Sequence, residues 1–281
     1  METKPNPFSI YDFLGYLIPG SVFLYGLLIV IKHISASDLS LDYIATKLSF
    51  KSEEIYLLFV LLSYISGHIL SFLSSITIER YSIWAHGYPS KYLLGITKSD
   101  YFPKEDKTRC VIRAVVGLIL LPIVLLDWLL GEKVGMRDLY AKPLDQLLIN
   151  VLRNKIEILI VNHAGIVPKT ETHGTPSEAD FFRYAYHYAV ENAHNHFAKM
   201  QNYVALYGFL RTLTLIAVII FWDLLWHMLS GVIPISVSLW FLFAAVILAY
   251  VLFMAFVKFY RRFSLEALMA MAVTVGKDEK H

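Results

Sequence analysis

The sequence has 281 residues, of which 57% are hydrophobic and 17% are charged, and its mean hydropathy is +0.54. A soluble domain is about 45–50% apolar and about 25% charged, so the composition excludes an ordinary soluble protein and predicts a multi-pass membrane protein. The net charge of +2 says little, because in a membrane protein the distribution of charge matters more than its sum. The single cysteine, Cys110, excludes an intrachain disulfide, a thiolate zinc cluster and a CxxC redox pair.

Four segments are long and apolar enough for transmembrane helices, which need about 17–25 such residues. In chain order they are residues 13–31, 55–78, 212–229 and 232–257. The first has little basic charge before it and no small-residue cleavage site after it, so we expect a retained span and not a removed signal peptide. The last contains no charged residue.

A fifth apolar run, residues 114–126, lies between Arg113 and Asp127 and contains Pro122. Its length is more typical of a buried core helix or a re-entrant segment than of a span. Basic residues flank it on both sides, so a fifth crossing would place one basic stretch outside, against the positive-inside rule. We therefore expect four crossings with both termini in the cytoplasm, and a fifth span within residues 111–130 is the alternative.

These crossings divide the chain into three parts. Residues 1–78 are expected to form an N-terminal membrane hairpin, and residues 204–281 a C-terminal membrane hairpin with a basic cytoplasmic tail. Residues 79–203 are expected to form a helical cytoplasmic domain between spans two and three, in which residues 114–126 are a buried or re-entrant helix. Helical spacing of apolar residues in the stretch 144–152, and the lack of Val/Ile alternation around hairpin turns, predict an all-α membrane protein.

Long helices are expected to extend the last two spans into the cytoplasmic part. The TPSE stretch, residues 175–178, is typical of a helix start. Residues 177–233 contain no proline, so a helix that begins at Pro176 can run straight into the third span. The alternative is a break at Gly208. The last span can likewise continue to Val275, because no glycine or proline lies between Ile235 and Val275.

The second span carries small residues at every fourth position. This small-xxx-small pattern lets two helices approach closely, and the same face can line a narrow polar pore once the helices rotate. Both interpretations concern the same stripe. The candidates for pore lining or helix packing are Ser63, Ser66, Gly67, Ser71, Ser74 and Ser75.

Three ionisable residues, Arg211, Asp223 and His227, belong to the third span and are candidates for a gate. An ionisable residue within a span is a functional hypothesis by default. Asp223 and His227 stand one helical turn apart on the same face, and Arg211 is near the expected cytoplasmic end, where its side chain can snorkel. The alternative is that Trp222 and Trp226 place Asp223 and His227 close to the membrane interface.

The densest polar cluster lies in the stretch EADFFRYAYHYAVENAHNHFAKM. On a helix, Asp180, His187 and His194 recur every seven residues, with Glu191 beside them. Glu191 and His194 are spaced like the Glu-x-x-His ligand pair of di-metal helix bundles. Such a site also needs carboxylates on facing helices, which the sequence does not indicate, so we predict no metal and no other cofactor. We expect instead a polar face that packs against a neighbour or another copy of the chain, stabilised by pairs such as His187 with Glu191.

A nucleotide or oligonucleotide ligand would need cationic contacts. Three residues lie between Arg183 and His187, which is fewer than in the Arg-His motif of HEPN ribonucleases. The chain also has no P-loop, GxGxxG, HExxH or GxSxG motif, so we do not expect an enzyme. The candidates for sensing or ligand binding are Arg153, Lys155, Arg183, His187, Glu191 and His194.

The stretch NPFSIYDFLGYLIPGSVFL, residues 6–24, resembles the N-termini of bacterial multi-pass proteins that accompany anti-phage defence systems. In overall plan the chain is also similar to their membrane effectors, of the CBASS or Hailong type. The resemblance implies a homo-oligomer in the bacterial inner membrane that forms a gated ion-conducting pore, or disrupts the membrane, on a cytoplasmic signal. It includes no catalytic motif and assigns no role to any residue.

The expected partners are the lipid bilayer, other copies of this chain, and a nucleotide, oligonucleotide or protein regulator. The main alternative function is a non-conducting membrane scaffold whose cytoplasmic domain recruits a partner. A transporter is disfavoured, because many transporters show an internal repeat of span pairs and none is evident here.

Overall fold

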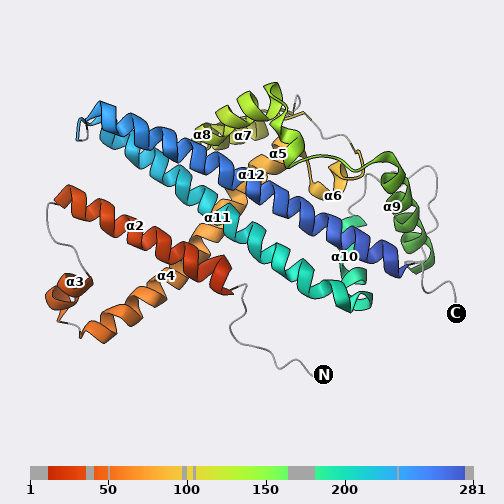
Figure 1. Cartoon of the computed structure of the whole chain (residues 1–281), viewed down its shortest axis with the longest axis horizontal. Coiled ribbons are helices and arrows are strands. Elements are labelled where there is room, and N and C mark those ends of the chain that lie inside the picture. Colours follow the sequence, from red (N-terminus) through yellow and green to blue (C-terminus); the bar gives the residue numbers. More distant parts are fainter. Residues whose placement is uncertain are drawn as a thin grey trace. The chain divides into compact units, whose positions relative to one another are not determined.

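The computed structural model describes residues 12–35, 41–49, 51–96, 100–103, 106–163, 181–232 and 234–275. All regular elements in these residues are helices, which confirms the predicted all-α class (Figure 1). The helices group into two compact units. Unit 1 contains Met1–Glu79 and Gly208–Phe253, and unit 2 contains Arg80–Tyr207 and Met254–His281.

Four helical stretches in the described residues are long and apolar enough to cross a membrane. They are Phe13–Val30, Glu53–Tyr92, His194–Leu229 and Ser238–Thr274. Each overlaps one of the four segments predicted to span. The chain therefore has the helices of a multi-pass membrane protein, as its composition predicts.

Unit 1 contains the N-terminal helices and one part of each of two long helices. The N-terminal helices are the π-helix η1 (Phe13–Leu17), α2 (Ile18–Ser35), α3 (Leu41–Leu48), α4 (Ser52–Ser74) and the π-helix η2 (Ser75–Glu79). The long helices are α11 (His194–Leu229) and α12 (Ile235–Thr274). The part of α11 from Gly208 onward and the part of α12 up to Phe253 belong to unit 1. Their lengths of 36 and 40 residues exceed the roughly 20 that a crossing requires.

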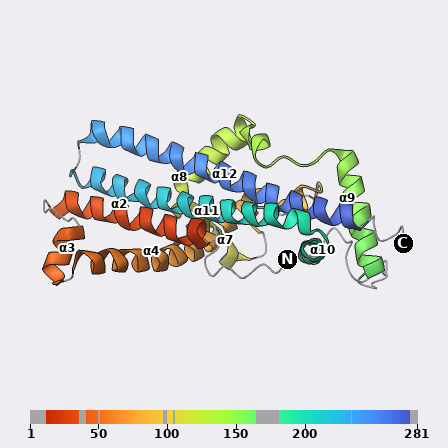
Figure 2. The same cartoon turned by 60° about the horizontal axis from the view of Figure 1, so that its bottom comes forward.

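Helices α2 and α4 lie side by side in unit 1 and touch through their backbones (Figure 2). A Cβ atom at Gly20 would overlap the carbonyl of Ser63, and one at Gly67 would overlap the carbonyl of Tyr16. Only glycine leaves room for this approach. The ring of Tyr16 also stacks on His68, with 3.8 Å between the ring centroids. The small-residue stripe of α4 is therefore used, in part, for packing against α2.

A tight turn joins α11 to α12. Gly231 in this turn has φ of 71°, a left-handed conformation that favours glycine. As a result α12 begins at Ile235, three residues after the predicted start of the last span. From there α12 continues unbroken to Thr274, which confirms the predicted extension, and α11 passes Gly208 without the alternative break.

Unit 2 contains shorter helices together with the start of α11 and the end of α12. The shorter helices are α5 (Arg80–His86), α6 (Pro89–Tyr92), α7 (Lys107–Ile119), α8 (Leu121–Leu126), the π-helix η3 (Asp127–Lys133), the 3₁₀-helix η4 (Met136–Leu139), α9 (Gln146–Ile158), the π-helix η5 (Leu159–His163) and α10 (Phe181–Asn192). Asp145 caps α9 by accepting the backbone N–H of Leu148 at 2.9 Å. The core of the unit is apolar side chains of α9, α10 and α12, among them Leu152, Ile156, Ala185, Ala189, Leu268 and Met271.

The apolar run predicted to be buried or re-entrant forms a bent pair of helices. The chain turns by 89° between α7 and α8, at Leu120. Pro122 lies in the first turn of α8, where its missing N–H cannot continue the hydrogen bonds of α7. The two arms are long and apolar enough for one span only when they are counted together. Leu118, Leu121 and Leu125 are exposed, so the run is not buried along its whole length.

The helix predicted to run from residue 176 into the third span is divided instead. Helix α10 ends at Asn192 and α11 begins at His194. The Asn192 side chain donates to the carbonyl of Tyr188 at 2.9 Å, a local bond of the kind that competes with helix continuation. In Figure 2, α10 is seen nearly end-on while α11 runs across the view, so the chain turns sharply here. The predicted helix start at residues 175–178 lies outside the described residues.

Candidate functional site

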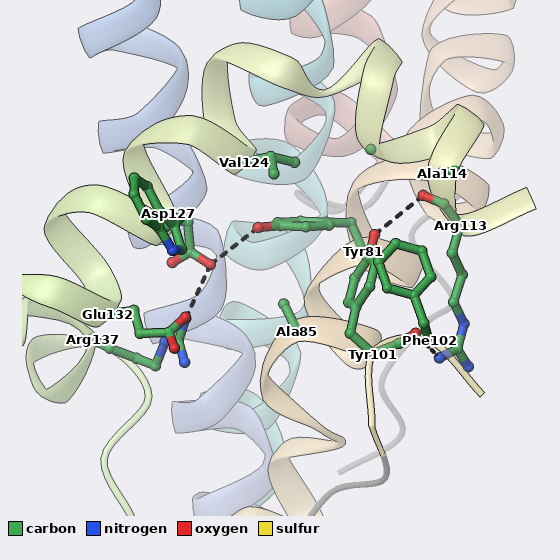
Figure 3. Close-up of a pocket in the computed structure, with 12 residues that line it drawn as sticks. Tyr81, Ala85, Tyr101, Phe102, Arg113, Ala114, Val124, Asp127, Glu132 and Arg137 are labelled. Atoms are coloured by element: carbon green, nitrogen blue, oxygen red, sulfur yellow. Dashed lines mark hydrogen bonds and ion pairs between the residues drawn. The ribbon is translucent and has the colours of Figure 1, made fainter. Parts of the chain in front are cut away.

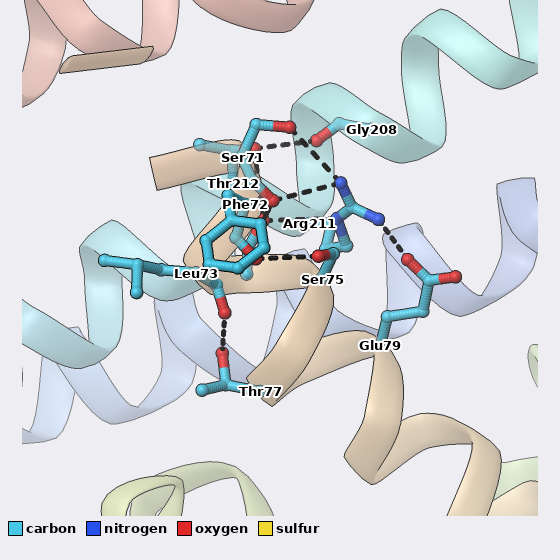
Figure 4. A network of polar contacts seen from close by, with 10 residues as sticks. Ser71, Phe72, Leu73, Ser75, Thr77, Glu79, Gly208, Arg211 and Thr212 are labelled. Atoms are coloured by element: carbon cyan, nitrogen blue, oxygen red, sulfur yellow. Dashed lines mark hydrogen bonds and ion pairs between the residues drawn. The ribbon is translucent and has the colours of Figure 1, made fainter. Parts of the chain in front are cut away.

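Arg211 is the centre of a polar cluster within unit 1 (Figure 4). Its side chain is only 12% exposed and forms an ion pair with Glu79, which is 21% exposed. Its Nε donates to Oγ of Ser74 at 3.1 Å. Its Nη2 donates to the carbonyl and to Oγ of Ser71, at 3.2 and 3.3 Å. One guanidinium therefore binds α11 to both α4 and the π-helix η2.

The positions of the partners follow from helix periodicity. Ser71, Ser75 and Glu79 recur at every fourth residue, so they lie along one face where α4 passes into η2. Ser74 is fully buried beside this face, and its Oγ lies 3.5 Å from Oγ of Thr212, the residue after Arg211. π-helical turns are rare and often occur at functional sites.

Arg211 was expected to snorkel toward the membrane surface, and the structure adds a partner for it that was not expected, Glu79. The partner of Arg211 is a carboxylate on the neighbouring helical segment. Opposite charges attract strongly in a weakly polar setting, and removal of either member would leave a costly buried charge. Glu79 was not among the residues predicted from the sequence. Its spacing of four residues from Ser75 was the signal that could have placed it on the same stripe.

The remaining stripe residues divide between two environments. Ser63 is fully buried and Gly67 is buried, both against α2. Ser66 is partly buried. The hydroxyl of Ser75 donates to the carbonyl of Phe72 within its own helix, at 2.7 Å. The stripe is thus occupied by α2 at one end and by Arg211 of α11 at the other.

The other two gate candidates pair with each other. Nδ1 of His227 lies 3.5 Å from Oδ1 of Asp223 and 2.9 Å from its carbonyl oxygen. Both side chains are partly exposed. Asp223 is 12 residues after Arg211 on the same helix, or about 18 Å along its axis, so the three gate candidates form two separate clusters.

A second polar cluster, around Asp127, was not predicted from the sequence (Figure 3). Asp127 is 1% exposed and accepts hydrogen bonds from the hydroxyls of Tyr81 at 3.1 Å and Tyr140 at 2.5 Å. Nη2 of Arg137 and Nε2 of His86 each lie 3.5 Å from its carboxylate. Buried carboxylates are paired and hydrogen-bonded in this way because an isolated one would be very costly.

A cavity of about 320 Å³ opens beside Asp127 in unit 2. The ring of Tyr101 lines it, and the Tyr101 hydroxyl donates to the carbonyl of Arg113 at 3.2 Å. Burial raises the pKa of the Tyr101 hydroxyl, which keeps it protonated as a donor. Arg113 in turn donates to the backbone carbonyl of Tyr101, and its guanidinium lies 5.1 Å from the ring centre of Trp84.

The basic and acidic side chains that line this cavity are equal in number. Arg113 and Arg137 are the basic lining residues, and Asp127 and Glu132 are the acidic ones. Arg137 approaches both carboxylates, at 3.5 and 3.7 Å. The cluster is therefore a self-neutralised polar core that joins α5 to η3 and the segment after it.

The histidine-rich segment lies mostly on the surface of unit 2. Arg183, His187 and Glu191 are exposed on α10. His194 is exposed at the start of α11, so the break between the helices interrupts the predicted seven-residue face. Asp180 lies outside the described residues. Among the described residues, no three His, Cys, Asp or Glu side chains are grouped so that they could hold a metal ion.

Two of the predicted ligand-binding candidates, Arg153 and Lys155, lie on α9. Nη2 of Arg153 donates to the backbone carbonyl of Leu94 at 2.7 Å, which ties α9 to the chain after α6. Lys155 is partly exposed. Neither lines the cavity beside Asp127.

Within the part of the chain that the structure describes, the fold defines a class: an all-helical protein with four helices long and apolar enough to span a membrane. No family model, curated protein or solved structure significantly matches the chain. Its function is therefore inferred from its own contacts.

Proposed function

We propose that this chain is a homo-oligomeric membrane effector that opens a gated ion-conducting path, or disrupts the bilayer, on a cytoplasmic signal. The observation that carries the proposal is the Arg211 cluster. It places a charged pair and two serine hydroxyls between helices that are otherwise apolar enough to span a membrane. Charged groups in such positions are expensive to maintain and usually mark ion pathways or switches.

In this proposal the Arg211–Glu79 pair holds the closed state. The guanidinium occupies the polar part of the α4 stripe, where it donates to the hydroxyls of Ser71 and Ser74. Release of the pair would free α11 from α4 and turn these hydroxyls toward a conducting path. The π-helix η2 begins at Ser75, and a π-helical turn of this kind often marks a functional site within a long helix.

Large apolar side chains on the outer faces of α4 and α12 support membrane insertion and self-association. Lipid tails or another copy of the chain would cover them, since water cannot solvate such faces cheaply. The exposed residues include Leu57, Val60, Leu61, Ile65, Ile69 and Phe72 on α4, and Leu239, Trp240, Phe241, Phe243, Leu248 and Val251 on α12.

The cellular setting is proposed from the sequence. The resemblance of residues 6–24 to N-termini of defence-associated proteins supports a role in anti-phage defence at the bacterial inner membrane. The distribution of Lys and Arg supports cytoplasmic termini.

A non-conducting scaffold is the second candidate, and one observation favours it. The small-residue stripe of α4 is filled within the single chain by α2 and by Arg211. If this packing is permanent, the stripe is structural and the membrane helices serve only to anchor a partner-binding unit.

The experiment that separates the two candidates is ion efflux from liposomes that contain the purified full-length protein. Glu79→Gln removes the charge that holds Arg211, and Glu53→Gln makes the same change at an exposed position of α4, the helix that precedes η2. We expect faster resting efflux from Glu79→Gln than from wild type, by about fivefold or more if about 1 kcal/mol of closed-state stabilisation is lost. Glu53→Gln should match wild type. A folded oligomer that never conducts in any variant would support the scaffold.

A further inference from the structure

The bent pair of helices in unit 2 carries exposed apolar side chains on both of its arms. One arm is α7, and the other is α8 with η3. Within each arm these side chains recur mostly at intervals of three or four residues, so they lie along one face. Each is at least 41% exposed, and a continuous apolar surface of this kind indicates a partner. This apolar stripe consists of Val111, Ile112, Val115 and Leu118 on α7, and of Leu121, Leu125, Trp128 and Leu129 on the second arm.

The other side of both arms packs on α5. Arg113 of α7 and Asp127 of η3 line the same cavity (Figure 3). The hydroxyl of Tyr81 on α5 donates to Asp127, and the guanidinium of Arg113 lies 5.1 Å from the ring centre of Trp84 on α5. The polar groups of the pair therefore bind the protein, and the apolar stripe lies on the side that the protein does not cover.

The position of α5 in the chain brings the bent pair close to the membrane. Helix α5 begins at Arg80, two residues after the predicted end of the second span at Ile78. It belongs to the continuous helical stretch Glu53–Tyr92, one of the four that are long and apolar enough to cross. An element that packs on α5 is therefore within reach of the membrane surface.

The bent pair has the wrong shape for a crossing. Helix α7 has 13 residues, and α8 and η3 have 6 and 7, so each arm is at most about 20 Å long. The hydrocarbon core of a bilayer is about 30 Å thick. The 89° turn at Leu120 also prevents the arms from adding their lengths. Two arms at a right angle can instead lie together in one plane, as helices at a membrane surface do.

Basic side chains stand at both ends of the apolar stripe. Lys107 is the first residue of α7 and Lys133 is the last residue of η3, and both are exposed. Nζ of Lys133 lies 5.7 Å from the ring centre of Trp128. A tryptophan beside a lysine is typical of the boundary between lipid tails and headgroups. The carboxylates next to these lysines in the sequence pair with arginines, Asp106 with Arg109 and Glu132 with Arg137.

We propose that the apolar stripe lies flat in the surface layer of an anionic phospholipid bilayer and is not a fifth span. Its apolar side chains enter the region between headgroups and tails, and Lys107 and Lys133 contact the phosphate groups. Phosphatidylglycerol represents the lipid. The inference does not rest on conduction, because a scaffold would attach to the bilayer in the same way.

The test measures the depth of a fluorescent label in the full-length protein, reconstituted in phosphatidylglycerol vesicles. Cys110, the single cysteine of the chain, is replaced by alanine, and Leu125→Cys carries the label. Nitroxide groups attached to the lipid, either near the headgroups or deep in the tails, quench a label at the same depth. We expect the shallow nitroxide to quench at least twofold more than the deep one. Stronger quenching by the deep nitroxide would indicate a span, and no quenching by either would indicate water or another copy of the chain. Both results would overturn the proposal.

A pair of double variants tests the apolar contribution with the same label. Leu118→Glu/Leu121→Glu places two carboxylates in the stripe and should reduce shallow quenching at least threefold. Leu139→Glu/Leu147→Glu makes the same change at positions outside the stripe that are 71% and 76% exposed, and should leave quenching unchanged. Equal responses of the two variants, with both proteins folded, would refute a specific role of the stripe.

A second pair tests the charge. Lys107→Gln/Lys133→Gln should at least halve shallow quenching in phosphatidylglycerol and have little effect in neutral phosphatidylcholine. Lys142→Gln/Lys155→Gln, which removes two positive charges of unit 2 outside the bent pair, should match the labelled parent in both lipids. Equal quenching of the labelled parent in the two lipids would contradict the preference for an anionic surface.

Discussion

The Arg211–Glu79 pair gives the sharpest stability prediction. An exposed ion pair contributes about 0–1 kcal/mol, whereas removal of one member of a fully buried pair costs about 3–5 kcal/mol. The two side chains here are 12% and 21% exposed, so the pair lies between these limits and nearer to the buried one. Arg211 also donates to Ser71 and Ser74. We therefore expect Arg211→Gln to lower the free energy of unfolding by about 2–3 kcal/mol.

The assay is thermal unfolding in detergent, followed by intrinsic tryptophan fluorescence, as a double-mutant cycle. Arg211→Gln, Glu79→Gln and the double variant are compared with wild type, and the double variant should be less destabilised than the sum of the singles by about 1 kcal/mol or more. Arg109→Ala is the control, because Arg109 pairs with Asp106 at a side chain that is 71% exposed. Additive effects of the two neutralisations would refute the claim that the residues act as a pair.

Two further substitutions test packing and the buried carboxylate, with unfolding again as the measurement. Gly67→Ala should cost about 2 kcal/mol or more, because its new Cβ meets the backbone of Tyr16, while Gly26→Ala, which meets nothing within 4 Å, should be neutral or slightly stabilising. Equal effects of the two would mean that η1 and α4 do not touch there. Asp127→Asn should cost about 2–4 kcal/mol, because Arg137 loses its buried partner, whereas Asp138→Asn on the surface should stay within about 0.5 kcal/mol. A neutral Asp127→Asn would show that this cluster does not stabilise unit 2.

Local patterns predicted most of the fold. Composition and run length located the four span candidates, because a crossing needs a minimum number of consecutive apolar residues whatever the tertiary structure. The absence of glycine and proline predicted the extension of α12 to Thr274. Spacing alone also placed Asp223 and His227 on one face, where they pair.

The polar clusters could be predicted only in part, because their partners are distant in the sequence. Arg211 and Glu79 are separated by 132 residues, and Asp127 and Tyr81 by 46. The break at Asn192 was also missed, since neither glycine nor proline marks it and a side-chain hydrogen bond to Tyr188 accompanies it. Helical periodicity gives the direction of a side chain, but tertiary packing decides what that side chain meets.

The division of the chain into units also differs from the expected domains. The predicted boundaries near residues 78 and 203 lie close to the observed ones at Glu79 and Tyr207. The tail after Phe253 groups with unit 2, and not with the C-terminal membrane hairpin. Its apolar residues explain this grouping, because Leu268 and Met271 are fully buried in the core of unit 2.

The central claim is that release of the Arg211–Glu79 pair opens a conducting path. Current recording across a planar bilayer that contains Glu79→Gln protein, purified as an oligomer of defined mass, tests it most directly. The proposal predicts stepwise or sustained currents that are much rarer with wild type and with Glu53→Gln. A flat baseline from a folded Glu79→Gln oligomer at every applied voltage would contradict it.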